Sequence, residues 1–220
     1  NHRHQLSGIV RQAISFDAGQ FVWLTLDRTP FAITEHPFSI SSCPAARPRL
    51  GFTIKEAGDF TNTIGTLKPG ARAFINGPHG NLILSGRTVQ GLTLIAGGVG
   101  IAPIMSILRQ LRAERDPRPV KLVYGNRLAE QILYRSELDN MVQNLWLDLH
   151  LVLSEPPPFW DGPVGSLDEP VLAQLLDIEP ASDWLYVVCG PAPMIDSVED
   201  ILEGLGVQMH QIISEKFSYD

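Results

Sequence analysis

A glycine-rich turn between a predicted strand and a predicted helix could bind an anion. An apolar run before Gly97 predicts a buried strand, and the residues after Gly100 have the apolar spacing of a helix. Gly97, Gly98 and Gly100 lie between this strand and this helix. Glycine lets the backbone approach a pyrophosphate closely, and the free N–H groups at the start of the helix face the anion. Pro103 suits a first helical turn, but it stands where the usual dinucleotide fingerprint has its third glycine. The segment favours nucleotide binding over a tight turn without a ligand.

His36, Phe38 and Ser39 could bind a flat heteroaromatic ring. Pro37 favours extended backbone, and an extended strand places alternate side chains, here His36 and Phe38, on one face. An aromatic ring beside a hydroxyl suits a planar ligand with a polar nitrogen edge. The alternative is an ordinary edge strand, in which Phe38 belongs to the core and His36 is exposed.

Two further segments leave both a ligand and a structural role open. A turn at Gly58 opens a short predicted helix with Asp59 as its cap. The hydroxyl of Thr61 in this segment could face an anion. The alternative is simply a capped helix. Cys189 ends a predicted strand at the carboxyl edge of a sheet, where doubly wound folds bind ligands. The alternative there is a buried structural cysteine.

The segments described above lie in a β-rich part of the chain that is followed by an α/β part. Up to Arg87, short runs of strand-forming residues alternate with glycine and proline, which predicts a small barrel or sandwich. From Thr88 onward strands alternate with helices, which predicts a doubly wound parallel sheet. We therefore expect two domains, 1–87 and 88–220. The predicted strands are 20–26, 38–41, 50–55, 71–76, 92–96, 120–124, 146–153, 184–189 and 211–214, and the predicted helices are 101–114, 129–144, 167–176 and 192–205.

Composition limits the classes of protein that fit. The 220 residues carry a net charge of −7, which disfavours wrapping of a nucleic-acid duplex. Two cysteines make no disulfide framework, and no cysteine cluster offers a metal or iron–sulfur site. The 21 uncharged residues between Arg87 and Arg109 are long enough for a bilayer, but their glycines and Pro103 favour a strand, a turn and a helix instead.

The order of these segments resembles the ferredoxin–NADP reductase superfamily, and more narrowly the cytosolic half of ferric reductases and NADPH oxidases. The resemblance covers nearly the whole chain, and several ordered motifs are more specific than one glycine turn. It implies a Greek-key FAD-binding β barrel, here truncated at its N-terminus, followed by an α/β domain with a five-stranded parallel sheet. The matching motifs are His-Pro-Phe-Ser at 36–39, Gly-Asp-Phe-Thr at 58–61, Gly-Pro-His-Gly at 77–80, Gly-Gly-Val-Gly-Ile-Ala-Pro at 97–103, Cys-Gly-Pro with Met at 189–194, and Glu-Lys-Phe at 215–217.

The resemblance implies an FAD site in the first domain. Phe38 would pack on the flavin, and Ser39 would form a hydrogen bond near flavin N5. His36 stands where the family usually has arginine, so no fixed charge on the pyrophosphate is implied. The remaining residues of this site would be Pro37 and Ile40 beside the flavin and Gly58, Thr61 and Asn62 at the FAD diphosphate.

The resemblance also implies a site for a nicotinamide dinucleotide in the second domain. Glu215 and Phe217 match the family's terminal acid and aromatic residue, and Phe217 would cover the flavin where the nicotinamide must stack. The predicted catalytic residues are Ser39, Cys189, Glu215 and Phe217. The residues that would line the dinucleotide site are Gly98, Val99, Gly100 and Pro103, with Cys189, Gly190, Pro191 and Met194 near the nicotinamide.

Asn126 and Arg127 follow the second strand of the α/β part and complete the predicted dinucleotide site. An arginine there can pair with a 2′-phosphate or stack on adenine. The sequence shows no acidic residue at this strand end to hold a free ribose 2′-hydroxyl. This favours NADPH, although relatives with such an arginine also use NADH.

We therefore expect a flavin-dependent NAD(P)H oxidoreductase whose two halves bring two cofactor rings together in a shared cleft. Electrons would pass to a redox acceptor protein, or to the haem of a membrane domain preceding Asn1, with this part in the cytoplasm. Two alternatives remain: a soluble reductase component that serves an oxygenase or other partner, and a non-catalytic module that binds flavin or nucleotide. No metal is expected, and His150 and His210 are expected to be ordinary residues of the fold.

Overall fold

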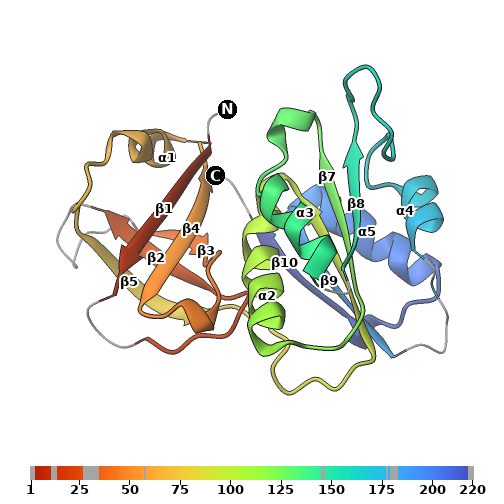
Figure 1. Ribbon diagram of the computed structural model, residues 1–220, viewed down its shortest axis with the longest axis horizontal. Coiled ribbons are helices and arrows are strands. Elements are labelled where there is room, and N and C mark those ends of the chain that lie inside the picture. The colour runs from red at the N-terminus through yellow and green to blue at the C-terminus, as the bar shows by residue number, and fades with distance from the viewer. Residues whose placement is uncertain are drawn as a thin grey trace. The chain divides into compact units, whose positions relative to one another are not determined.

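The chain, taken from a computed structural model, forms two compact units (Figure 1). The structure describes residues 3–10, 14–26, 35–56, 58–144, 147–176, 178 and 183–217. The first unit contains the described part of Asn1–Ser85 together with Ala102–Glu114. The second contains Gly86–Ile101 and the described part of Arg115–Ser218. The predicted boundary at Arg87 remains a prediction.

The described residues of the first unit form two antiparallel sheets and two α-helices. Its elements are β1 (Arg3–Ile9), β2 (Phe21–Leu26), β3 (His36–Ser39), β4 (Arg49–Lys55), α1 (Asp59–Thr63), β5 (Ala73–His79) and α2 (Ile101–Glu114). β1 pairs with β4, and β2 lies between β3 and β5. Apolar residues of these strands and of the segments next to them form one core, which includes Val22, Ile40, Phe52 and Ile64. The unit therefore has the barrel-like antiparallel architecture that the sequence predicts.

Two details of the first unit differ from the sequence-based expectation. β1 was not predicted, because five of its seven residues are polar or glycine and its pairing with β4 defines it. Gly58, not Asp59, caps α1, because the backbone N–H of Gly58 donates to Thr61 Oγ1 at 3.0 Å. Asp59 is the first residue of the helix, where its charge favours the helix dipole.

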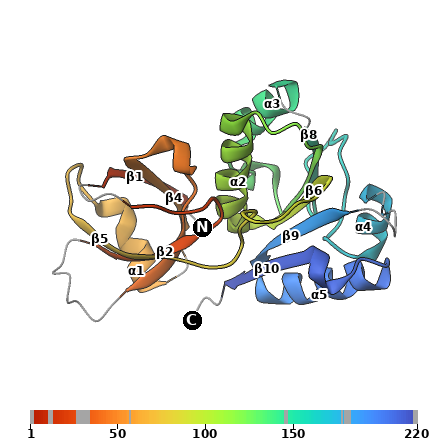
Figure 2. The same ribbon diagram turned by 90° about the horizontal axis from the view of Figure 1, so that it is seen from below.

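The second unit is a five-stranded parallel sheet with the strand order β10-β9-β6-β7-β8. Its elements are β6 (Gly91–Gly97), β7 (Val120–Asn126), α3 (Arg135–Asn144), β8 (Leu147–Leu153), α4 (Glu169–Leu175), β9 (Trp184–Pro191), α5 (Ala192–Gly204) and β10 (Ile212–Phe217). Helix α3 lies on one face of the sheet, and α4 and α5 lie on the other (Figures 1 and 2). This confirms the predicted doubly wound sheet.

The strand order reverses between β6 and β9. The chain passes from β6 through β7 to β8 on one side of β6 and then returns to β9 on its other side. The register aligns Ala96 of β6 with Cys189 of β9, and Cys189 with Glu215 of β10. Ligands of doubly wound sheets bind at such a reversal, outside the carboxyl ends of the strands. The predicted glycine turn and Cys189 therefore both lie at this position.

The predicted helix at 129–144 is wrong in its first part. A single 3-10 turn covers Ala129–Gln131, Tyr134 has a φ of 59°, and α3 begins only at Arg135. A residue with positive φ cannot continue a right-handed helix, so the segment is divided there. In the described ranges of the chain, no helix has both the length and the apolar character needed to cross a bilayer.

Candidate functional site

Three rings lie together beside β3 in the first unit. The rings of His36 and Phe60 stack with centroids 3.9 Å apart and planes 22° apart, and those of Phe38 and Phe60 are 6.0 Å and 23° apart. This confirms that His36 and Phe38 share a face of the strand. Burial lowers the pKa of His36, which favours a neutral imidazole. Phe60 is not among the predicted site residues, although it lies within the motif at 58–61.

Ser39 ends this strand with a buried hydroxyl. Ser39 is 6% exposed, and its Oγ has no hydrogen-bond partner among the residues that the structure describes. Pro37 is exposed, whereas the side chain of Ile40 lies in the core of the unit. Within the predicted flavin-binding strand, Ser39 thus has a side-chain oxygen that lacks a hydrogen-bond partner among the described residues. A ligand with a polar edge would satisfy it.

The segment predicted to hold a diphosphate is accounted for by helix capping. Thr61 Oγ1 accepts a hydrogen bond from the Gly58 N–H and donates one to the Gly58 carbonyl oxygen, each at 3.0 Å. Helix α1 is a single turn of five residues. Asn62 is exposed on it. The structural alternative therefore suffices for Gly58 and Thr61, and their contact with FAD stays a prediction.

The glycine turn after β6 contains glycines of two kinds. A Cβ added to Gly100 would lie 2.2 Å from the carbonyl oxygen of Cys189, so close packing of the turns after β6 and β9 requires this glycine. Gly97 is restricted less strictly, since an added Cβ would lie 2.3 Å from Sδ of Met194, which is a flexible side chain that can shift. Gly98 differs, because it has a φ of 54° and open space where a Cβ would lie.

Other contacts fix the position of this turn. Tyr124 is fully buried in β7, and its hydroxyl donates to the Gly98 carbonyl oxygen at 3.0 Å while accepting from the Leu133 N–H at 3.3 Å. Val99 is half-buried, and Pro103 lies in the first turn of α2, as predicted. These contacts therefore fix the turn, and Gly98 is the glycine of the turn at which an added side chain would meet open space.

Cys189 and Glu215 lie side by side at the carboxyl ends of β9 and β10. The Cys189 thiol is fully buried and donates to the Glu215 backbone oxygen at 3.8 Å. Glu215 Oε2 is buried and has no hydrogen-bond partner within the described part of the chain. Burial raises the pKa of Glu215 from 4.5 to about 7. Burial, and then the charge of Glu215, raise the pKa of Cys189, so the thiol stays protonated.

The residues after Cys189 have mixed roles. Pro191 is exposed and caps α5, whereas Met194 packs against Gly97 and Gly190 and so fills the space between two turns. Phe217 pairs with Pro191 in the β10–β9 register. Its side chain lies outside the described part, and its predicted contact with the flavin stays a prediction. The shared cleft also remains a prediction.

The end of β7 carries a further polar side chain without a hydrogen-bond partner among the described residues. Both Oδ1 and Nδ2 of Asn126 are buried without a hydrogen-bond partner among the described residues. The backbone oxygens of Asn126 and Arg127 accept from the N–H groups of Ser154 and Glu155, at 3.1 and 2.9 Å. Arg127 Nε lies 3.9 Å from Glu155 Oε1. No acidic residue directly follows β7, but the end of the neighbouring parallel strand β8 supplies Glu155.

Comparison with known proteins finds a family match in the α/β part of the chain. Residues 94–200 match the family model for the oxidoreductase NAD-binding domain. NADH-cytochrome b5 reductase 1 of Laccaria bicolor is 33% identical over 175 residues, which cover 77% of this chain and 57% of that protein. The protein of the same name from Pyricularia oryzae is 30% identical over 162 residues, or 72% of this chain and 52% of that protein. The chain thus spans little more than half the length of these relatives.

Solved structures share the whole fold. The ferredoxin reductase in carbazole 1,9a-dioxygenase has a TM-score of 0.85 and 26% identity, and the match covers 98% of this chain and 65% of that one. The cytochrome b5 reductase domain of Ulva prolifera nitrate reductase has a TM-score of 0.82 and 19% identity, with 97% and 91% covered. The fold, the matched domain and these relatives together place the chain in the ferredoxin reductase-like superfamily of FAD- and NAD-binding proteins.

Proposed function

We propose that the chain is the cofactor-binding part of a flavin-dependent NAD(P)H oxidoreductase. The observation that carries the proposal is the buried hydroxyl of Ser39, which lacks a partner among the described residues and ends the strand that holds His36 and Phe38. Leaving a buried polar group unsatisfied costs about 1–3 kcal/mol. A planar ligand with a polar nitrogen edge, such as a flavin, would remove this cost.

The residues of the first unit fit FAD in two respects. Phe38 offers an apolar ring on the face that it shares with His36 and Phe60. Ser39 offers a hydroxyl that can donate or accept at the edge of the flavin. When bound, FAD would accept a hydride from NAD(P)H and release single electrons.

The residues of the second unit fit a nicotinamide dinucleotide. Gly98 leaves open space at the carboxyl end of β6, where the backbone of the turn could approach a pyrophosphate. The buried amide of Asn126 offers both a donor and an acceptor. With a pKa of about 7, Glu215 can hold a proton at neutral pH and donate it in a hydrogen bond to a ligand carbonyl. Cys189, which stays protonated, orders the neighbouring strand end rather than acting as a nucleophile.

We infer NADH as the preferred coenzyme. Glu155 neutralises Arg127 in part and would repel a 2′-phosphate, while its carboxylate could accept hydrogen bonds from a free ribose. The name of the fungal relatives, NADH-cytochrome b5 reductase, supports the same choice. This inference replaces the preference for NADPH that the sequence alone suggests.

We infer a haem protein as the electron acceptor. The relatives named above are reductases of cytochrome b5, and the resemblance to ferric reductases, which stays a prediction, also leads to a haem. A flavin can accept two electrons from a nicotinamide and pass them on one at a time, so a one-electron acceptor such as a haem is suitable.

Anaerobic reduction of the FAD-loaded chain tests the proposed function. NADH should bleach the flavin absorbance, and oxidised cytochrome b5 should then restore it while becoming reduced. FAD that binds without bleaching would favour the non-catalytic module instead. Failure of FAD to bind at all would overturn the proposal.

A further inference from the structure

The outer edge of β8 has no described strand partner from Leu147 to Leu151, and Trp160, Asp161, Gly162 and Pro163 line the same pocket as these residues. β8 ends the strand order, and no described strand lies beyond it (Figure 1). Near its end, the backbone N–H of Leu153 donates to Pro163 and its carbonyl oxygen accepts from Gly165. Because backbone groups alternate along a strand, those of Leu147, Leu149 and Leu151 also point to this outer edge. These three residues have no strand partner there in the described structure.

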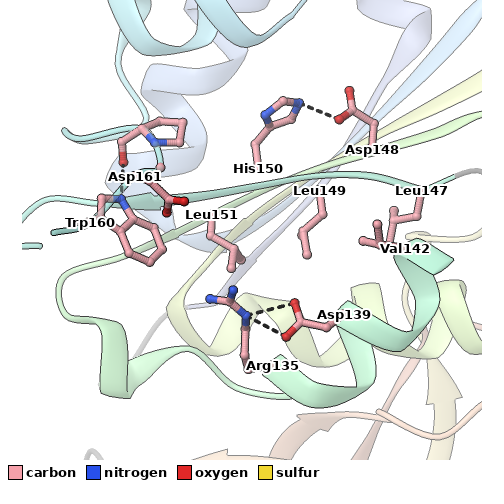
Figure 3. A pocket seen from close by; sticks show the side chains of 12 residues that line it. Arg135, Asp139, Val142, Leu147, Asp148, Leu149, His150, Leu151, Trp160 and Asp161 are labelled. Carbon is pink, nitrogen blue, oxygen red and sulfur yellow. Dashed lines mark hydrogen bonds and ion pairs between the residues drawn. The ribbon is translucent and has the colours of Figure 1, made fainter. Parts of the chain in front are cut away.

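A pocket of about 400 Å³ follows this edge, and no predicted cofactor residue lines it (Figure 3). Leu147, Leu149 and Leu151 point toward α3, whereas Asp148 and His150 point to the opposite face (Figure 3). His150 Nε2 lies 3.0 Å from Asp148 Oδ1, with side chains 25% and 56% exposed. The edge therefore carries leucines on one face, of which Leu147 and Leu151 are buried within the chain, and an acid and a base on the other, where Lys121 Nζ also lies 3.5 Å from Asp148 Oδ2.

We propose that this edge binds the same edge of a second copy of the chain, antiparallel, with the two-fold axis at Leu149. A two-fold axis requires a surface that is complementary to itself. With Leu149 opposite its own copy, Leu147 faces Leu151 of the second copy and Asp148 faces its His150. Every side chain then meets a partner of its own kind or of complementary polarity.

The backbone pattern suits the same register. Leu147, Leu149 and Leu151 carry the outward N–H and carbonyl groups, so the pairs that they form are hydrogen-bonded pairs, giving about six bonds across the axis. Asp148 and His150 then fall in non-hydrogen-bonded pairs, in which side chains approach more closely. An acid and a base gain most from facing each other at such positions.

Charge selects this register over its neighbours. An axis at Asp148 would place that carboxylate opposite its own copy, and an axis at His150 would place two imidazoles together. Like charges directly opposite each other destabilise paired strands. Among the symmetric registers centred on Asp148, Leu149 or His150, only that at Leu149 pairs the acid with the base. Charged residues on an edge commonly prevent pairing, but here their order permits it.

Three charge variants of the full 220-residue chain test the proposal, with the dimer dissociation constant measured by sedimentation equilibrium. Asp148→His places two imidazoles together, and His150→Asp places two carboxylates together. Each is expected to raise the dissociation constant about tenfold or more. The double variant D148H/H150D exchanges the two charges, restores both pairs and should return the constant to nearly the original value.

Two further variants separate dimerisation from folding. Leu149→Pro removes an N–H that points outward, which edge strands tolerate, so the chain should stay folded by circular dichroism but become monomeric. Asp200→Lys changes the charge of α5, which packs against β9 and β10, and should leave the dimer unchanged. A chain that is monomeric at every concentration, or a dimer that the single variants leave intact, would overturn the proposal.

Discussion

Ser39 and Ser106 are both buried serines of the first unit, but they differ in what their hydroxyls contact. Ser106 Oγ donates to the Ser42 carbonyl oxygen at 2.6 Å, whereas Ser39 Oγ has no partner in the described structure. The first arrangement is structural. The second is typical of a site that awaits a ligand.

Replacing Ser39 with alanine is expected to slow the reduction of bound FAD by NADH about a hundredfold, as loss of a positioned donor at a reacting group does. The FAD dissociation constant should rise less than about tenfold, the value of one neutral hydrogen bond. Stopped-flow absorbance and FAD titration measure the two effects. Ser106→Ala serves as the control, since it should lower the free energy of unfolding and leave the rate unchanged. Equal losses in rate and affinity at Ser39 would contradict its assignment near N5.

Glu215 should make the chain less stable as pH rises. Its pKa is about 7 in the folded protein and 4.5 ordinarily, so between these values the folded state holds a proton that the unfolded state has lost. The free energy of unfolding therefore falls across that window, by about 3 kcal/mol in total, and is constant above it. Glu215→Gln removes the titration. Urea unfolding should show the variant gaining stability over the original chain from about pH 5 to pH 8. A difference that does not vary with pH would contradict the buried carboxyl.

Arg127 and Glu155 should have opposite effects on coenzyme choice. Arg127→Ala is expected to raise the KM for NADPH about tenfold, because a charged hydrogen bond to the 2′-phosphate is lost, with little change for NADH. Glu155→Gln should instead lower the KM for NADPH, because it removes a repelling carboxylate 3.9 Å from Arg127. Steady-state kinetics with both coenzymes measures the two ratios. Unchanged ratios in both variants would exclude these residues from the 2′ subsite.

At the scale of elements, two glycines of the turn between β6 and α2 are needed for different reasons. Gly100 allows close packing, whereas Gly98 adopts a positive φ. Gly100→Ala would push a Cβ to 2.2 Å from a backbone oxygen, which neither strand end can avoid. It should lower the free energy of unfolding by about 3 kcal/mol. Gly98→Ala meets open space and has only its φ of 54° to accommodate, so about 1 kcal/mol is expected.

The same pair should differ in ligand binding. Gly98→Ala is expected to remain folded and to bind NADH more weakly, because the added methyl group occupies the open space of the turn. Calorimetric titration with NADH and urea unfolding of both variants provide the comparison. A Gly98→Ala protein with unchanged NADH affinity would show that the turn is a structural connection without a ligand.

At the scale of the whole molecule, the two units should respond to different ligands. If each unfolds as its own cooperative unit, calorimetry should resolve two transitions, with FAD raising the temperature of one and NAD⁺ that of the other. A ligand at about a hundredfold its dissociation constant adds about 2.7 kcal/mol to the unit that binds it. The Glu215→Gln variant identifies the transition of the second unit, since its shift depends on pH. One transition raised by both ligands would show that the units unfold together.

Much of the architecture follows from local pattern. The apolar runs of β6, β7 and β9 alternate with helices, so a parallel sheet is the solution that buries them, and the structure confirms it. Strand β1 could not be found in this way, because its burial pattern is mostly exposed and only β4 holds it in place. Phe60 was missed for the same reason, since its stacking on His36 joins residues distant in sequence.

The sequence alone determined the order of motifs, the change from antiparallel to parallel sheets and the set of candidate residues, because these depend on residue type and short spacing. Only the tertiary structure decided which of them lack a partner or face a charge. Among the described residues, it left Ser39 and the Glu215 carboxylate oxygen without a hydrogen-bond partner, committed Thr61 to a helix cap, and placed Glu155 beside Arg127. Burial and the alignment of strand ends arise from packing between distant segments, which no local pattern specifies.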